Sequence, residues 1–204
     1  MTAAGRLREA DRWVTSRIAA WDSPYARHAL PAVGWAAKHS KVWCASAALM
    51  AGFGGRRGRT AARAGLSAVA LGQVAATFAV KPLTHRARPP RQLIHHQTGQ
   101  RPESSSFPSG HTAAAVAFTA SVGRTWPAMG AVCAVPAAMV SFERVYSGAH
   151  YPSDVAAGAV VGLAAARLVS VLPLLRQHST GKQGKGREAC CLFGFGMGRR
   201  AMSS

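Results

Sequence analysis

The sequence predicts an all-α protein, a multi-pass transmembrane helical bundle with about five or six membrane helices. Three observations lead to this prediction. Charged residues make up only 16% of the 204 residues, yet the formal net charge is +18. Long uncharged apolar runs separate short basic clusters. Between Ser23 and Arg187 the acidic residues are Glu103, Glu143 and Asp154 alone. A soluble fold normally carries charges of both signs, whereas a membrane protein gathers basic residues beside its spans.

The distribution of the basic residues also argues against a nucleic-acid partner. A nucleic-acid binder would carry Lys and Arg as a stripe among polar and aromatic residues, and this chain does not. We therefore expect membrane lipids and an anionic, lipid-linked substrate as partners, and a multi-pass protein of the cell membrane. Residues 1–27 contain no continuous apolar stretch, so no cleavable signal peptide is predicted.

Residues 1–27 read as a polar, partly helical arm. Trp13, Ile18 and Trp21 could share one side of it, which would make an interfacial helix at the membrane surface. The alternative is a solvated, weakly ordered terminus. At the other end, residues 177–204 are rich in Gly, Lys and Arg and are expected to form a basic flexible tail.

Five apolar runs lie between these ends, within a predicted membrane domain of residues 28–176. They are residues 42–55, 64–80, 109–123, 126–142 and 152 to about 175. A basic turn at residues 56–59 is expected to close the first run. Several runs are shorter than the roughly 20 residues that cross a hydrocarbon core, but five of them leave too little polar surface for a soluble bundle. An early hairpin beginning near residue 30 would make six crossings. Basic residues divide almost equally between the two faces, so the orientation stays open.

The four cysteines have no metal-ligand spacing, and we expect neither a metal nor a cofactor. Cys44 and Cys133 lie in apolar runs and are interpreted as small buried hydrophobic residues. The adjacent Cys190 and Cys191 could be lipidated or redox-active, or be an ordinary part of the tail.

Three polar clusters interrupt the apolar runs, and each lies where a helix ends or begins. They are residues 81–89, 108–111 and 144–154. If the second to fifth runs each cross the membrane once, all three clusters emerge on one membrane face. Segments far apart in the sequence are therefore predicted to meet in one pocket.

The residues of these clusters suit a phosphate group. Pro108 marks a helix start, so Ser109, Gly110 and His111 would lie in a first turn, where free N–H groups favour an anion. Three cations would neutralise the phosphate oxygens: Lys81, Arg88 and Arg144.

Two histidines are candidates for catalysis. His150 lies four residues before Asp154, whose carboxylate could fix the imidazole tautomer, so His150 is predicted to be the nucleophile of a phosphohistidine intermediate. His111 would protonate the leaving alkoxide and later activate water. The other histidines are interpreted as structural: His28, His39, His85, His95, His96 and His178. Three arginines are interpreted as solvated or headgroup contacts: Arg86, Arg91 and Arg101.

Together these residues resemble the three-part signature of the type 2 phosphatidic acid phosphatase superfamily, which includes bacterial lipid phosphatases and vanadium haloperoxidases. The resemblance implies an all-helical bundle and metal-independent hydrolysis of a phosphomonoester or diphosphate. It implies that phosphate is bound by Lys81, Arg88, Ser109, Gly110 and Arg144 and that His111, His150 and Asp154 are catalytic. The chain departs from the family pattern at Glu143, where serine is usual. We expect Glu143 to pair with a nearby cation such as Arg144 or Arg86.

Residues 36–43 also look like a small actinobacterial-type branch of the superfamily. Some members of that branch are associated with dephosphorylation of decaprenylphosphoryl-phosphoribose. The expected substrate is thus a polyprenyl-linked phosphate or diphosphate, or a phosphatidic acid-type lipid. Two alternatives are a vanadium-dependent haloperoxidase, with the histidine at position 150 as a vanadium ligand, and a catalytically idle membrane binder.

Overall fold

The protein is all-helical in a computed structural model that describes residues 2–21, 23–93 and 104–191. No strand occurs among these residues, which confirms the predicted fold class. The described residues form α-helices in the order α1 (Ala3–Ala19), α2 (Pro24–Ala37), α3 (Lys41–Phe53), α4 (Gly55–Val74), α5 (Gly110–Thr125), α6 (Pro127–Tyr146) and α7 (Pro152–Cys191). Shorter turns of helix are η1 (Lys38–Ser40), η2 (Ala75–Val80), η3 (Lys81–Leu83) and η4 (Arg91–Leu93).

The chain divides into two compact units, Met1–Val169 and Ser170–Ser204. The first unit holds α1 to α6 and the beginning of α7, and all three polar clusters belong to it. The second unit continues α7 to Cys191. The domain boundaries expected at residues 27/28 and 176/177 stay predictions.

Each of the five apolar runs forms a helix, but one boundary differs from the prediction. Residues 56–59 do not form a turn, because α4 already begins at Gly55. The reversal takes place at Gly54 and Gly55, and Gly55 has the left-handed φ of 56° that glycine adopts without a Cβ penalty. Arg57, in the first turn of α4, donates from Nε to the Thr125 carbonyl oxygen at 2.9 Å. The basic cluster therefore ties the start of α4 to the end of α5.

Within the part of the chain that the structure describes, three helices are long and apolar enough to cross a membrane: Gly55–Leu83, Pro127–Tyr146 and Pro152–Leu172. They also carry large apolar side chains on the outer surface of the first unit. Phe78 is 75% exposed and Val160 is 66% exposed. Without a membrane around the helices, both side chains would face water. This exposed surface suits a lipid environment, in agreement with a multi-pass membrane fold.

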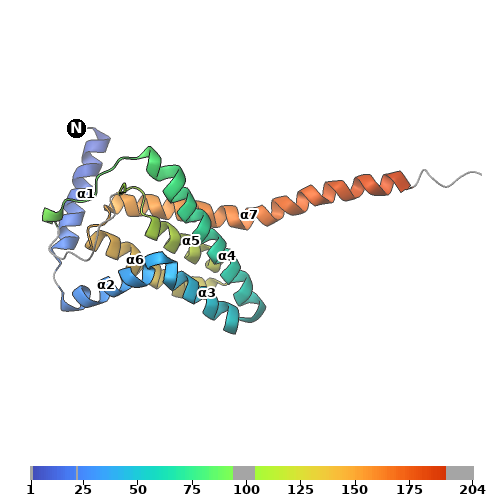
Figure 1. Ribbon diagram of the computed structural model, residues 1–204, viewed down its shortest axis with the longest axis horizontal. Coiled ribbons are helices and arrows are strands. Elements are labelled where there is room, and N and C mark those ends of the chain that lie inside the picture. Colours follow the sequence, from blue (N-terminus) through green and yellow to red (C-terminus); the bar gives the residue numbers. More distant parts are fainter. Residues whose placement is uncertain (1, 22, 94–103, 192–204) are drawn as a thin grey trace, which may run out of the picture. The chain divides into compact units, whose positions relative to one another are not determined.

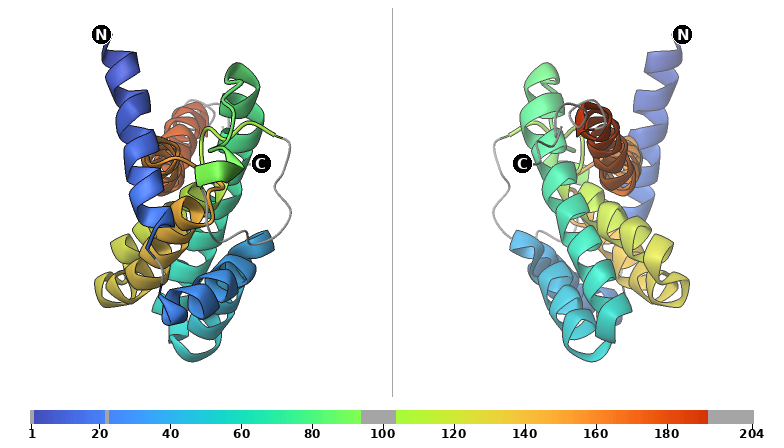
Figure 2. Two further views of the ribbon diagram at one scale, coloured as in Figure 1. Left: turned by 90° about the vertical axis from the view of Figure 1, so that its left-hand side faces the viewer. Right: turned by 90° about the vertical axis from the view of Figure 1, so that its right-hand side faces the viewer.

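Helix α5 is the central element of the first unit, and it packs against α4 on one side and α6 on the other (Figures 1 and 2). Its face toward these helices is made of small residues, so the backbones approach closely. Among its buried alanines, Ala113, Ala115 and Ala117 are fully inaccessible. Phe118 fills the remaining space against Trp43 of α3, with ring centroids 5.3 Å apart. The close packing of these alanines, with Phe118 and Trp43 in the space that remains, fixes where α5 begins relative to its neighbours.

The beginning of α7 lies against α5 through two glycines spaced four residues apart. A Cβ atom on Gly158 would lie 2.4 Å from the Ser109 carbonyl oxygen, and one on Gly162 would lie 2.5 Å from that of Ala113. Contacts this short cannot form, so any side chain here would push the two helices apart.

We therefore expect Gly158→Ala to destabilise the protein by about 1–3 kcal/mol through overpacking. Thermal unfolding of the detergent-solubilised protein measures the change. Gly52→Ala is the matched control, since a Cβ at this position in α3 meets nothing within 4 Å. Gly52→Ala should be neutral or slightly stabilising, because alanine favours the helix. Equal unfolding temperatures for the two variants would contradict the close packing of α5 and α7.

Candidate active site

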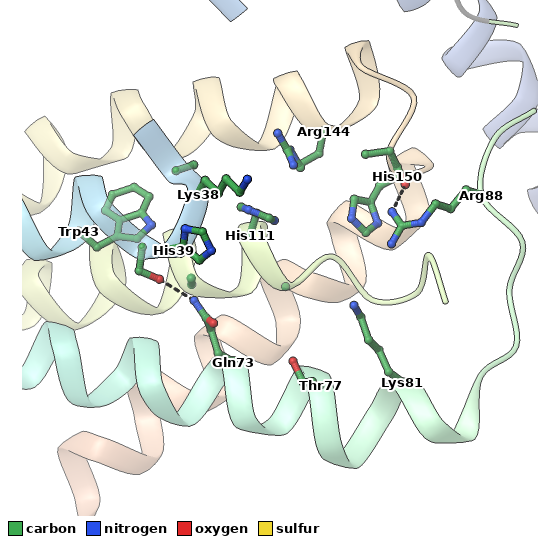
Figure 3. Close-up of a pocket in the computed structure, with 15 residues that line it drawn as sticks. Lys38, His39, Trp43, Gln73, Thr77, Lys81, Arg88, His111, Arg144 and His150 are labelled. Atoms are coloured by element: carbon green, nitrogen blue, oxygen red, sulfur yellow. Dashed lines mark hydrogen bonds between the residues drawn. The ribbon is translucent and has the colours of Figure 1, made fainter. Parts of the chain in front are cut away.

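A cavity of about 360 Å³ opens at the end of the bundle where α5 begins. The elements that meet there are the end of the α4 helix, the first turn of α5, the end of α6 and the loop before α7. All three polar clusters contribute to its wall, as the count of crossings predicted (Figure 3). Of the predicted site residues, those lining the cavity are Lys81, Arg88, Gly110, His111, Arg144 and His150.

Lys81 and Arg88 meet at Ser104, in the segment that precedes α5. Lys81 Nζ and Arg88 Nη2 each lie 3.5 Å from the Ser104 hydroxyl. Arg88 also donates from Nε to the Ser104 carbonyl at 3.2 Å and from Nη1 to the Ala149 carbonyl at 2.7 Å. Arg88 thereby connects the segment before α5 with the loop that carries His150, while it faces the cavity.

Ser109 and Gly110 differ in their relation to the cavity. Ser109 is the N-cap of α5: its Oγ accepts from the Thr112 N–H at 3.4 Å and from the Thr112 hydroxyl at 3.0 Å. The Ser109 side chain is fully buried and is not part of the cavity wall. Gly110, at the first position of α5, does line the wall. The capping bonds of Ser109 therefore fix the helix start that presents Gly110 and His111.

Glu143 and Arg144 form an ion pair at the end of α6. Nε and Nη2 of Arg144 both contact Oε2 of Glu143. Of the two partners predicted for Glu143, the structure confirms Arg144. Glu143 is buried, whereas Arg144 reaches the cavity wall. Because the pairing turns the carboxylate toward its own arginine, the unusual Glu143 need not project its charge into the pocket.

His150 is held by a backbone carbonyl that the sequence motifs do not reveal. Its Nδ1 donates to the Ser106 carbonyl oxygen at 2.5 Å, which assigns the Nδ1–H tautomer and leaves the Nε2 lone pair free. The Asp154 Oδ2 atom lies 3.8 Å from Nδ1, beyond hydrogen-bond distance. Asp154 therefore acts on His150 as a neighbouring charge, and Ser106 fixes the orientation of the ring. Burial lowers the pKa of His150 more than the adjacent Asp154 carboxylate raises it, which favours the neutral imidazole.

Asp154 is completely buried, and each of its carboxylate oxygens accepts a hydrogen bond. Its Oδ2 accepts from the Tyr151 N–H at 2.8 Å, and its Oδ1 accepts from Arg86 Nη1 at 2.7 Å. The interpretation of Arg86 as a solvated or headgroup contact is therefore wrong. Arg86 lies on the polar segment after α4 and reaches the first turn of α7, where it neutralises a buried carboxylate.

A second carboxylate, Asp11 of α1, completes this arrangement. Its Oδ2 accepts from Arg86 Nη2 at 2.5 Å and from the Ser153 hydroxyl at 2.6 Å, and its Oδ1 accepts from the Ser153 N–H at 3.0 Å. Asp11 is 3% exposed. Helix α1 is thus fastened to the start of α7 by an acidic residue, and it is not only the interfacial arm that Trp13 and Trp21 suggested.

The cavity also includes residues outside the three clusters, among them Lys38, His39 and Ser40 of η1 and Gln73 of α4. His39, which was interpreted as structural from the sequence, lines the pocket, and its role stays a prediction. His28 keeps a structural contact, from its ring Nδ1 to the Pro24 carbonyl at 2.8 Å. His95, His96 and His178 lie outside the residues whose side chains the structure describes.

No group of three or more His, Cys, Asp and Glu that could hold a metal occurs among the described residues.

Comparison with known proteins places this geometry in a family context. A family model described as the PAP2 superfamily matches residues 61–177. Over 100 residues the chain is 33% identical to proteins named decaprenylphosphoryl-5-phosphoribose phosphatase from two Mycobacterium tuberculosis strains, CDC 1551 and H37Rv. That match covers 49% of this chain and 55% of the relative, so the chain spans about half the length of the curated relatives it matches.

Two solved structures share the fold. The first, described as the first transmembrane PAP2 type phosphatidylglycerolphosphate phosphatase from Bacillus subtilis, aligns with a TM-score of 0.60 at 22% identity. It covers 84% of this chain and 87% of that one. The second, Aquifex aeolicus LpxE, aligns with a TM-score of 0.62 at 22% identity and covers 76% of this chain and 92% of that one.

Proposed function

Because this chain belongs to the PAP2 superfamily, we propose that it is a lipid-phosphate phosphatase of the cell membrane that works through a phosphohistidine intermediate. One observation carries the proposal: His150 is fixed through Nδ1 by the Ser106 carbonyl, which directs Nε2 away from that bond, on the wall of a cavity that also holds Lys81, Arg88 and Arg144. A neutral imidazole beside three cations is the arrangement that a nucleophilic attack on a phosphate requires.

The reaction we propose has two steps. Nε2 of His150 attacks phosphorus, and the bond from phosphorus to the leaving oxygen breaks. His111 donates to that oxygen the proton that it takes up when the negatively charged phosphate binds beside it. Water then attacks the phosphohistidine as His111 accepts a proton from it, which releases inorganic phosphate and restores free His150. Asp154 stabilises the positive charge on the imidazole during both steps. Lys81, Arg88 and Arg144, with the N-terminus of α5 at Gly110, bind the phosphate oxygens, and Ser109 acts by capping that helix.

For the substrate we propose a polyprenyl-linked phosphate. The relatives named decaprenylphosphoryl-5-phosphoribose phosphatase support this choice, as does the site's position at the end of an apolar bundle. A lipid tail can remain among the exposed apolar side chains while its phosphate enters the cavity.

A phosphate-release panel tests the proposal. The purified chain in non-ionic detergent is given a polyprenyl monophosphate, a polyprenyl diphosphate, a polyprenyl-phosphoryl ribose 5-phosphate and phosphatidic acid, each with and without EDTA. We expect release from at least one polyprenyl substrate, unchanged by EDTA, because protein cations supply the positive charge. Release that stops with EDTA and returns with a divalent metal would contradict the proposed mechanism.

Asp11 is expected to be a positioning residue for this reaction. Asp11→Ala removes the carboxylate to which Arg86 Nη2 and Ser153 donate, although Arg86 keeps Asp154, and it loosens the start of α7. We therefore expect kcat to fall about tenfold, the size of one lost charge-assisted hydrogen bond. The value of KM should change little, because the cavity cations stay in place. Glu9→Ala on the exposed side of α1 is the control and should match wild type. If Asp11→Ala lowered the unfolding temperature but left kcat intact, the residue would be structural only.

A further inference from the structure

The cavity continues past the three polar clusters to the break between α2 and α3. At this end its wall is formed by Lys38, His39 and Ser40 of η1 and by Gln73 and Thr77 from the α4 side. Figure 3 shows Lys38 and His39 directed into the same space as His111 and Arg144. None of these five wall residues has a part in the proposed attack on phosphorus.

The backbone at this break has an unusual conformation that a side-chain contact holds in place. His39 and Ser40 both have left-handed conformations, with φ of 57° and 59°, which non-glycine residues rarely adopt and which occur preferentially at functional sites. The Ser40 hydroxyl accepts from the Gln73 amide at 2.6 Å, so the break is tied to α4. Lys41, three residues after Lys38, leaves the cavity, with its Nζ 4.1 Å from the centroid of the Trp35 ring. The break therefore places Lys38 in the cavity wall and Lys41 outside the cavity.

The size and the charge of the cavity exceed what one phosphate needs. Its volume of about 360 Å³ lies within the range of about 300–1,000 Å³ that holds whole small-molecule ligands. Lys81, Arg88 and Arg144 already supply three cations for the scissile group. Lys38 adds a fourth on a different wall, beside hydroxyl and amide groups suited to a polar spacer. A fourth cation with polar neighbours fits a ligand that has a second negative charge.

We propose that Lys38, supported by His39, Ser40 and Gln73, binds a second phosphate of the substrate, a phosphodiester linked to the scissile phosphate through a short polar spacer such as a sugar. The inference rests on the proposed phosphatase function and names the substrate class within it. The Lys38 subsite would favour substrates that carry two phosphates joined by a spacer. A simple lipid monophosphate would leave Lys38 without an anion.

Two synthetic substrates that differ only in the second phosphate test the inference. One is a short-chain alkyl-phosphoryl ribose 5-phosphate, and the other is the alkyl riboside 5-phosphate, which lacks the phosphodiester. Assays in non-ionic detergent without phospholipid ensure that the second phosphate comes from the substrate alone. For wild type we expect kcat/KM to be about tenfold higher with the diester, the usual value of one charge-assisted hydrogen bond.

The variant Lys38→Gln should abolish this preference by lowering kcat/KM for the diester substrate about tenfold, while the riboside stays within about twofold of wild type. Lys41→Gln is the matched control, since it removes the neighbouring cation that faces Trp35, and it should keep the preference. His39→Asn removes the imidazole and keeps a residue that tolerates the left-handed backbone, so it should weaken the preference without unfolding the chain.

The outcomes separate this inference from the function on which it rests. If wild type releases no phosphate from either substrate or from the polyprenyl panel, the proposed function and the inference both fail. If both substrates are hydrolysed but Lys38→Gln changes them equally or not at all, the phosphatase function stands and the second subsite is overturned. An effect of Lys38→Gln that appears only in phospholipid vesicles, and equally for both substrates, would assign Lys38 to a lipid headgroup and also overturn it.

Discussion

Replacement of His150 by asparagine is expected to lower kcat for phosphate release by about 10⁴-fold or more, as loss of a covalent nucleophile does in comparable enzymes. Asparagine offers a side-chain N–H to the Ser106 carbonyl, as Nδ1 of His150 does at 2.5 Å. It has no counterpart of Nε2, the atom that we propose attacks phosphorus. The measurement is steady-state phosphate release in detergent, with the unfolding temperature recorded alongside.

The asparagine variant makes this prediction independent of folding. His150 is buried, so alanine at this position would also remove a hydrogen bond and leave a void. If His150→Asn keeps the wild-type unfolding temperature and loses turnover, the missing nucleophile is responsible. Turnover near the wild-type rate in a folded His150→Asn protein would exclude His150 as the nucleophile.

Replacement of His111 by asparagine should lower kcat by about 10²–10⁴-fold for alkyl phosphates, the range usual for a general acid. The loss should be much smaller for p-nitrophenyl phosphate, since nitrophenolate leaves without protonation. His111 is at the first turn of α5, and it lines the same cavity as His150, so a leaving oxygen can lie between them. Comparing the two leaving groups measures proton donation itself.

Arg144→Gln is the matched contrast for the His111 experiment. Arg144 lines the same cavity, but a guanidinium keeps its proton and does not act as a general acid, and in the proposed mechanism Arg144 binds phosphate oxygens. We expect Arg144→Gln to slow both substrates by similar factors. A similar loss for both substrates in His111→Asn would mean that His111 binds phosphate and is not the general acid.

The sequence predicted the parts of the site that local spacing encodes. Pro152 is the first residue of α7, as predicted, whereas Pro108 lies two residues before α5 begins at Gly110. Counting the apolar runs was enough to bring Lys81, His111 and Arg144 to one end of the bundle. The pairing of Glu143 with Arg144 was also predictable, because adjacent opposite charges in a buried helix end attract each other.

The contacts that hold the nucleophile could not be predicted in this way. The Ser106 carbonyl belongs to the backbone, so no side-chain pattern marks it as the partner of His150. Asp11 and Ser153 lie 142 residues apart in sequence, and only the docking of α1 brings them together. Nothing in the sequence distinguishes Arg86 from the other arginines of its segment. Its contact with Asp154 depends on the path that the chain takes after α4. Long-range polar contacts of this kind are set by the tertiary fold, not by periodicity.

The start of α4 shows that the local sequence also fails to predict some helix boundaries. Arg56, Arg57 and Arg59 read as a turn because charges rarely continue an apolar helix, yet Gly54 and Gly55 supply the reversal and the arginines begin the next helix. The Thr125 carbonyl that accepts from Arg57 lies in another helix, so its contribution is invisible in the local sequence.

Trapping of the covalent intermediate would decide whether the phosphoryl group passes through His150. The protein is mixed with a ³²P-labelled lipid phosphate, quenched in alkali within milliseconds to seconds, and digested for peptide mapping. The proposed mechanism predicts protein-bound label that is stable in base, labile in acid and located on the peptide containing His150, and no such label in His150→Asn. Full turnover with no base-stable label at any time, or label located on another residue, would contradict it.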